Sequence, residues 1–169
     1  NKEAATRNRA VRGELFPGQR LLCPNDRVVV MQNTYRDGQF VANGEFLNVT
    51  RVASEVEIRE IDLPQRKGQL PQRVPLIFRE IGAQMLTLDQ EVFDFDALIL
   101  DTYLHAPERV DNTALLRALT IDFQQRNPHL DPQVDIDAYS EALKADAYFN
   151  ALRLRFGYAV TCHKAQGGE

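Results

Sequence analysis

The residues best suited to chemistry gather at the end of the chain: Thr161, His163, Lys164, Gln166, Gly167, Gly168 and Glu169. A hydroxyl, an imidazole and backbone N–H groups left uncovered by two glycines can all donate hydrogen bonds to phosphate oxygens. The alternating run Phe156–Thr161 predicts a strand just before them, and loops after strands are the usual ligand sites of α/β sheets. The segment therefore indicates a phosphate-contacting loop, whereas the alternative is an ordinary turn with a structural histidine.

Thiol chemistry is a second possibility here, because Cys162 precedes His163 and the two could act as nucleophile and base. Neighbouring residues on a strand point to opposite faces, which disfavours that pairing. Cys23 and Cys162 are too few for a disulfide framework, and neither has a CxxC metal-binding spacing. A reducing cytoplasm is the expected setting.

Three helices are predicted, one near the start and two in the last third of the chain. The first covers residues 2–15, ends at Phe16-Pro17-Gly18 and repeats at helical spacing through Ala4, Ala5, Asn8, Val11 and Leu15. The second begins at Asn112 or Thr113, stops at Asn127-Pro128 and shares one apolar face among Leu115, Leu116, Leu119 and Phe123. The third follows residues 132–137 and continues through Ala138, Ala142, Ala145 and Phe149.

Short strands fill residues 19–104, with turn dipeptides such as Asp37-Gly38 and Asn43-Gly44 between them. The strand candidates are residues 27–31, 55–59, 74–78, 85–88 and 95–100. Pro75 should lie at an edge or a bulge, and residues 63–71 should form a loop. Five or six such strands predict a small barrel. The strand at 156–161 follows the helices alone, so its partners are expected outside this chain.

Composition narrows the class of protein. The chain has 169 residues, 44% hydrophobic and 26% charged, which excludes wholesale disorder, and it has no apolar run long enough for a membrane helix. The net charge of −4 gives no overall nucleic-acid signature, but residues 1–20 are locally basic. That basic stretch either meets phosphate or is a solvated helix face. With neither an initiator Met nor a signal peptide, the chain is expected to come from a longer protein.

Three segments resemble superfamily 1 DNA helicases of the RecD-like type. Residues 159–169 are similar to helicase motif V, which in this family reads as a small apolar strand followed by Thr-x-His-Lys-x-Gln-Gly-x-Glu. Asn1-Lys2-Glu3-Ala4 followed by Asn8 and Arg12 resembles the segment around motif IV. Residues 24–30 and 40–45 resemble the opening of the small barrel inserted in these helicases, although Asn25 replaces the usual Gly and Phe46 stands where a Gly often follows.

The resemblance implies an α+β fragment in which a small SH3-like β-barrel is inserted into part of a RecA-like α/β domain. Residues 1–18 would begin the second RecA-like domain, and 19–104 would form the inserted barrel. Residues 105–155 would be a helical connection, and 156–169 would return to the RecA-like domain.

The resemblance also implies site residues. Thr161, His163 and Lys164 would contact DNA, together with Tyr35 and Arg36 of the barrel, where Arg27 and Phe40 also suit backbone contact or base stacking. Gln166, Gly167, Gly168, Glu169 and Arg12 would face the nucleotide. The alternatives are that Arg12 makes a surface salt bridge and that Tyr35 and Phe40 are barrel core.

The implied parent is an ATP-dependent DNA helicase, similar to exodeoxyribonuclease V alpha subunits and to the UvrD-like helicase C-terminal region. It would translocate on single-stranded DNA and unwind duplexes in recombination and repair, using ATP and Mg²⁺ with the first RecA-like domain. Other recombination or nuclease subunits would be its partners. The chain has no G-x-x-x-x-G-K-[ST] loop and no Walker B carboxylate pair, so we expect neither bound ATP nor ATPase activity from it alone. The alternative is a non-catalytic nucleic-acid-binding β-barrel module.

Overall fold

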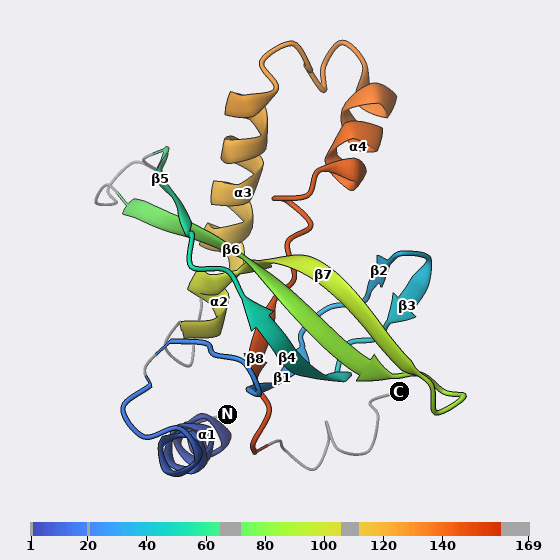
Figure 1. Cartoon of the computed structure of the whole chain (residues 1–169). Coiled ribbons are helices and arrows are strands. Elements are labelled where there is room, and N and C mark those ends of the chain that lie inside the picture. Colours follow the sequence, from blue (N-terminus) through green and yellow to red (C-terminus); the bar gives the residue numbers. More distant parts are fainter. Residues whose placement is uncertain (1, 20, 65–71, 106–111, 160–169) are drawn as a thin grey trace.

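The computed structural model describes residues 2–19, 21–64, 72–105 and 112–159 and has a mixed α+β architecture (Figure 1). The helices are α1 (Lys2–Leu15), α2 (Asp101–His105), α3 (Asn112–Arg126) and α4 (Ile136–Ala145). The strands are β1 (Arg27–Val30), β2 (Thr34–Arg36), β3 (Gln39–Val41), β4 (Phe46–Val52), β5 (Glu57–Leu63), β6 (Gln72–Leu86), β7 (Val92–Leu100) and β8 (Leu154–Phe156). In Figure 1, α3 and α4 lie at one end of the molecule and α1 at the other. No helix in the described ranges is long and apolar enough to cross a membrane.

One antiparallel sheet organises the molecule. Its order is β5-β6-β4-β1-β8, and β7 also pairs with β6. The long strand β6 carries β5 along its first half and both β4 and β7 along its second half. A separate two-stranded hairpin, β2–β3, connects β1 to β4. Its Asp37 and Gly38 have φ values of 48° and 81°, the left-handed backbone that the Asp-Gly dipeptide predicts.

The sheet curls, but its described strands do not form a closed barrel. A single parallel bridge joins Ile99 of β7 to Leu152, which precedes β8. Around it, Leu100 N–H donates to Leu152 O at 2.9 Å and Leu152 N–H donates to Leu98 O at 2.8 Å. Among the described residues no strand pairing joins β7 to β8, so the contact between the two ends of the sheet is limited to this bridge. The α+β class is confirmed, and the closed barrel expected from the strand count is not.

The last strand finds its partner inside this chain. Leu154–Phe156 pairs antiparallel with β1, placing Val28 opposite Phe156 and Val30 opposite Leu154. The expectation that the partners of this strand lie elsewhere is therefore wrong for its described part. The physical reason is burial, since Leu152 and Leu154 are fully enclosed in the core of this sheet. The strand also lies earlier than predicted: β8 ends at Phe156, residues 157–159 are not in a strand, and residues 160 and 161 lie outside the described residues.

The strands predicted at 74–78 and 85–88 belong to one continuous strand, β6, which ends at Leu86 before Thr87 and Leu88. The intervening charged residues hid this, although Ile81 and Ala83 between them are fully buried. At Gly82 the neighbouring strand passes so close that an added Cβ would lie 2.7 Å from Thr50 Oγ1. Pro75 lies in the half of β6 that is paired with β5 alone among the described strands, as its missing N–H requires.

The helices cover a second core. Leu115, Leu119 and Phe123 of α3 are buried, but Leu116 is 45% exposed, so its predicted place on the core face is wrong. At 3.6 residues per turn, Leu116 lies about 100° around the helix from Leu115. The third predicted helix is shorter than expected: α4 starts at its N-cap Asp135 and ends at Ala145, before Phe149.

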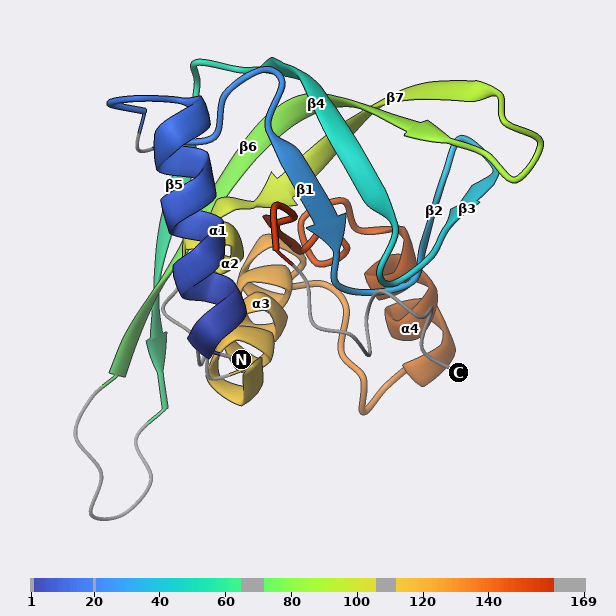
Figure 2. The ribbon, with the colours of Figure 1, turned by 90° about the horizontal axis from the view of Figure 1, so that it is seen from below.

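Helix α1 forms where predicted, but it turns a different face to the protein. Val11 and Leu15 are exposed, whereas Arg12 is 6% exposed. The helix lies beside the β1 end of the sheet (Figure 2). Polar contacts instead of apolar packing therefore attach it, and these contacts form the first part of the candidate site.

Candidate nucleic-acid interface

A buried ion pair joins α1 to the loop before β1. Arg12 Nε donates to Asp26 Oδ1 at 2.8 Å, and Nη2 donates to Asp26 Oδ2 at 2.8 Å. The Asp26 side chain is 0% exposed. Removing two such charges from water is costly unless their remaining hydrogen-bonding groups are also satisfied.

Neighbouring groups satisfy the remaining hydrogen-bonding groups of Arg12 and Asp26. Arg12 Nη1 donates to Gln19 O at 2.8 Å, Nη2 also donates to Leu21 O, and the guanidinium lies 4.5 Å from the centre of the Phe156 ring. Asp26 accepts the Tyr158 hydroxyl at 2.7 Å and the Cys23 N–H at 2.9 Å. We call Arg12, Asp26, Cys23 and Tyr158 the junction cluster, because they join α1, the start of β1 and the chain after β8.

The electrostatics follow from this arrangement. Burial by itself would raise the pKa of Asp26, but hydrogen bonds from Arg12, Tyr158 and Cys23 outweigh it and hold the pKa below its ordinary value. Burial and the hydrogen bond to Asp26 raise the pKa of Tyr158 to about 12. Burial and the same carboxylate raise the pKa of the Cys23 thiol. Asp26 is therefore held ionised, while Tyr158 and Cys23 are held protonated.

One helical turn before Arg12, Asn8 contacts the far end of the described chain. Its Nδ2 donates to Ala159 O at 2.9 Å, and Ala159 N–H donates to its Oδ1 at 2.6 Å. Asn8 and Arg12 belong to the motif IV-like segment, Asp26 to the barrel opening, and Ala159 is the first residue of the motif V-like segment. Residues from the motif IV-like segment and from the first part of the barrel opening thus meet Ala159, the one described residue of the motif V-like segment.

The structure places the predicted nucleotide contact Arg12 inside the junction cluster. Arg12 does make a salt bridge, as the alternative has it, but the pair is buried and does not lie at the surface. A nucleotide would have to compete with Asp26 for the same guanidinium. The remaining predicted residues in the C-terminal segment lie outside the described residues: Thr161, His163, Lys164, Gln166, Gly167, Gly168 and Glu169.

The β2–β3 hairpin holds the other predicted DNA contacts. Tyr35 and Phe40 are cross-strand partners with ring centroids 5.2 Å apart, and they are 67% and 44% exposed. The alternative that they form barrel core is therefore wrong. Arg36 Nη2 donates to Asn150 O at 3.0 Å, which ties the hairpin to the chain after α4, and burial lowers the pKa of this guanidinium. An exposed aromatic pair on an anchored hairpin is a surface on which a base can stack.

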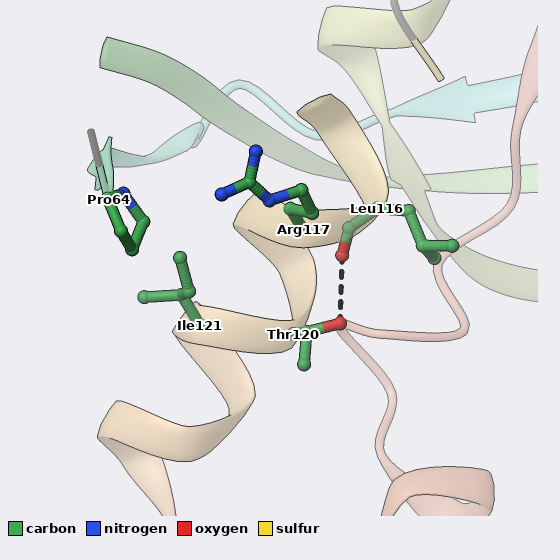
Figure 3. Close-up of a pocket in the computed structure, with 5 residues that line it drawn as sticks. All are labelled: Pro64, Leu116, Arg117, Thr120 and Ile121. Atoms are coloured by element: carbon green, nitrogen blue, oxygen red, sulfur yellow. Dashed lines mark hydrogen bonds between the residues drawn. The ribbon is translucent and has the colours of Figure 1, made fainter. Parts of the chain in front are cut away.

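Other surfaces fit phosphate less well. On the basic N-terminal helix, Arg7 pairs with Glu3 at 2.7 Å, which favours a solvated face there. A hollow of about 340 Å³ on α3 is lined by Pro64, Leu116, Arg117, Thr120 and Ile121 (Figure 3). Its lining is mostly apolar with Arg117 as its one charged residue, and Thr120 donates its hydroxyl to Leu116 O at 2.9 Å.

Asp26 and Tyr158 were not foreseen as site residues. Their one sequence signal is indirect: Asn8 and Arg12 are four residues apart and therefore share a helix face, which suggests a polar partner opposite. No protein-family model matches the chain, and a search of curated proteins finds no match.

Proposed function

We propose that this chain is part of an ATP-dependent DNA helicase of the RecD-like type. One observation carries the proposal. Asn8 binds Ala159 and Arg12 binds Asp26, so residues from segments that resemble motif IV and the inserted barrel meet the first residue of the motif V-like segment, although they are far apart in sequence. A shared helicase ancestry accounts for that meeting, because those motifs surround one nucleotide and DNA site in such enzymes.

Under this proposal the curled sheet corresponds to the SH3-like barrel inserted in the second RecA-like domain. The parent protein, in the cytoplasm, translocates on single-stranded DNA and unwinds duplexes during recombination and repair, with other recombination or nuclease subunits as possible partners in the same assembly. Thr161, His163 and Lys164 contact the DNA backbone, and Gln166, Gly167, Gly168 and Glu169 face the nucleotide. ATP and Mg²⁺ belong to the parent, since this chain has neither a Walker A loop nor a Walker B pair.

Binding to single-stranded DNA tests the proposal. The full chain should bind a fluorescent oligothymidine weakly, with an affinity that falls as salt rises. His163→Ala should weaken binding, whereas His129→Ala, the same change at an exposed histidine on the α3–α4 connection, should not. Equal affinity of wild type and H163A would remove His163 from the site. ATP hydrolysis by this chain alone, stimulated by the oligonucleotide, would overturn the expected absence of turnover.

The exposed Tyr35 and Phe40 pair favours a second candidate, a nucleic-acid-binding β module with no motor. The gene sequence on both sides of this segment separates the two. A Walker A loop upstream and an arginine-bearing motif just after Glu169 support the helicase. Their absence from the whole reading frame leaves the binding module.

A further inference from the structure

Three arginines lie on or contact the chain that leads from α4 into β8. Arg153 and Arg155 belong to this chain, and the leucines on either side of Arg153 are fully buried in the core. Successive residues of an extended chain point to opposite faces, so both arginines lie on the face away from that core. There the Arg155 guanidinium lies 5.3 Å from the centre of the Tyr103 ring. Arg36 of the β2–β3 hairpin reaches the same chain by donating Nη2 to Asn150 O at 3.0 Å.

The guanidinium groups of these three arginines have no salt bridge to a carboxylate within the described part of the chain. Arg36 donates to neutral oxygens instead, namely Thr34 Oγ1 at 3.0 Å, Tyr35 O at 2.8 Å and Asn150 O. The Nε of Arg153 is buried and has no hydrogen-bond partner among the described residues. Four other arginines that are buried or half-buried each have a carboxylate partner: Arg12–Asp26, Arg59–Asp122, Arg79–Asp101 and Arg126–Asp146.

Burial makes the positive charge costly at Arg36 and Arg153. It lowers the pKa of both guanidinium groups, although Asp37 acts in the opposite direction on Arg36 and Tyr103 does so on Arg153. Both groups stay protonated at neutral pH, because the pKa of an arginine lies far above it. The cost of removing a charge from water is offset when an opposite charge takes the place of that water. A bound anion would therefore recover part of this cost.

Phosphate is the anion that this arrangement suits. A guanidinium group offers parallel N–H donors to two oxygens at once, and a phosphate has enough oxygens for more than one such group. Asn150, where Arg36 attaches, precedes Arg153 by three residues, so at most about 10 Å of chain separates the two attachment points. Arg36 points away from the exposed rings of Tyr35 and Phe40, because neighbouring residues of a strand face opposite sides. The phosphate-binding surface is therefore distinct from the aromatic pair.

We propose that Arg36 and Arg153, with Arg155 beside them, form a phosphate-binding site where the β2–β3 hairpin meets the chain that enters β8. The contacts that define this site do not depend on the helicase assignment. Inorganic phosphate, a mononucleotide and a nucleic-acid backbone share the required chemistry, and only the last of them bears on the proposed function.

Arg153→Met, studied in the full chain, tests the site against a purely structural role. It replaces an unpaired, partly buried charge by an apolar chain, so the thermal midpoint without ligand should equal or exceed that of wild type. Its affinity for inorganic phosphate, measured by calorimetry at constant ionic strength, should fall about tenfold, since a hydrogen bond to a charged group is worth roughly that factor. Arg117→Met, the same change at an arginine of the α3 hollow, should bind phosphate as wild type does. Unchanged phosphate affinity in R153M would overturn the site, whatever its midpoint.

Arg36→Lys provides a second test that holds even if R153M loses stability. It keeps the positive charge but loses the planar pair of donors, so phosphate affinity should fall about threefold. An R36K protein that matches wild type in both thermal midpoint and phosphate affinity would remove Arg36 from the site.

The source of the phosphate follows from comparing inorganic phosphate, thymidine monophosphate and oligothymidine on wild type and R153M. Oligothymidine that binds more tightly than the monophosphate, and loses affinity in R153M, assigns the site to a nucleic-acid backbone. A monophosphate that binds as tightly as oligothymidine assigns it to a small phosphate ligand. Binding of inorganic phosphate that R153M weakens, with no binding of oligothymidine, would support the site and count against the proposed function. Failure of wild type to bind any of the three would overturn the site itself.

Discussion

The Tyr158 hydroxyl donates to the Asp26 carboxylate at 2.7 Å across 132 residues of sequence. The same carboxylate receives both Nε and Nη2 of Arg12. One buried aspartate thus holds together the first helix, the first strand and the last described residues of the chain.

Asp26→Ala should be among the most destabilising single changes in this protein. It would leave the guanidinium of Arg12 buried without its counter-charge, a loss that typically costs about 3–5 kcal/mol. Urea denaturation followed by circular dichroism would measure the change. Asp62→Ala removes the carboxylate of the fully exposed pair Asp62–Arg73 and should leave the midpoint unchanged. A D26A midpoint equal to that of D62A would contradict the buried role.

Alkaline stability should depend on Tyr158. Its folded pKa, about 12, lies above the ordinary value of 10, so the contribution is complete below pH 10 and is lost as the pH rises through 12. The wild type should therefore lose more stability than Tyr158→Phe between pH 9 and about pH 11. Urea midpoints across that range would measure the difference. Parallel curves for the two proteins would argue against the raised pKa.

Stability in acid should depend on Asp26, which accepts the hydrogen bond from Tyr158. The folded pKa of Asp26 lies below its ordinary value of 3.8, so its contribution is complete at neutral pH and is lost as pH falls below that value. Asp26→Asn should flatten the fall in stability below about pH 4 relative to wild type. Acid titration monitored by tyrosine fluorescence would compare them, and an equally steep fall in D26N would assign the acid sensitivity to other carboxylates.

The stability of the packing between α3 and β5 should depend on Asp122 of α3. This buried carboxylate accepts Arg59 Nη1 from β5 and Arg126 Nε, and both guanidinium groups stack on Tyr148 at 3.8 and 4.7 Å. Asp122→Ala should cost roughly 2–4 kcal/mol, because it leaves two arginines without a shared partner. Glu141→Ala, exposed on α4, is the control in the same urea experiment. Equal midpoints for the two variants would mean that Glu57, Asp146 and the Tyr148 ring hold the two arginines without Asp122.

The exposed hairpin should contribute to DNA affinity without contributing much to stability. Tyr35→Ala should weaken oligothymidine binding by about 1–3 kcal/mol if a base stacks there. Leu88→Ala, at a fully exposed apolar residue on the β6–β7 turn, should leave affinity unchanged. Fluorescence anisotropy at low salt would measure both. A similar loss in both variants would point to nonspecific adhesion of exposed apolar groups.

Short-range sequence patterns predict part of the fold. The helix at 2–15, the Asp37-Gly38 turn and strands β1, β5, β6 and β7 form at or near the positions that short-range patterns predict, whereas β2, β3 and β4 were not among the predicted strands. The orientation of α1 did not follow, because helical period defines faces but not which face is buried. Arg12 is buried and Val11 exposed because Asp26, which also binds Tyr158, lies opposite Arg12. Asp26 and Tyr158 become neighbours of the helix only once the sheet has formed.

The candidate site, like the fold, could be predicted from the sequence only in part. The exposure of Tyr35 and Phe40 could not be read from the sequence, since an alternating apolar strand looks alike at an edge and in a core. Arg36 was foreseen as a surface cation, yet it also anchors its hairpin through Asn150 O, a contact across 114 residues.

Leu152 is hydrogen-bonded to both Leu98 and Leu100 at the end of β7. The chain leaves the sheet after Leu100 and returns at Leu152, so the stems of the whole helical excursion touch each other. In polymer terms, residues 101–151 are a long loop closed by adjacent strands, and lengthening or shortening such a loop costs little closure entropy. The connections within this excursion can therefore gain or lose residues at little cost in closure entropy, whereas the buried face of α3 has to stay because it covers the second core.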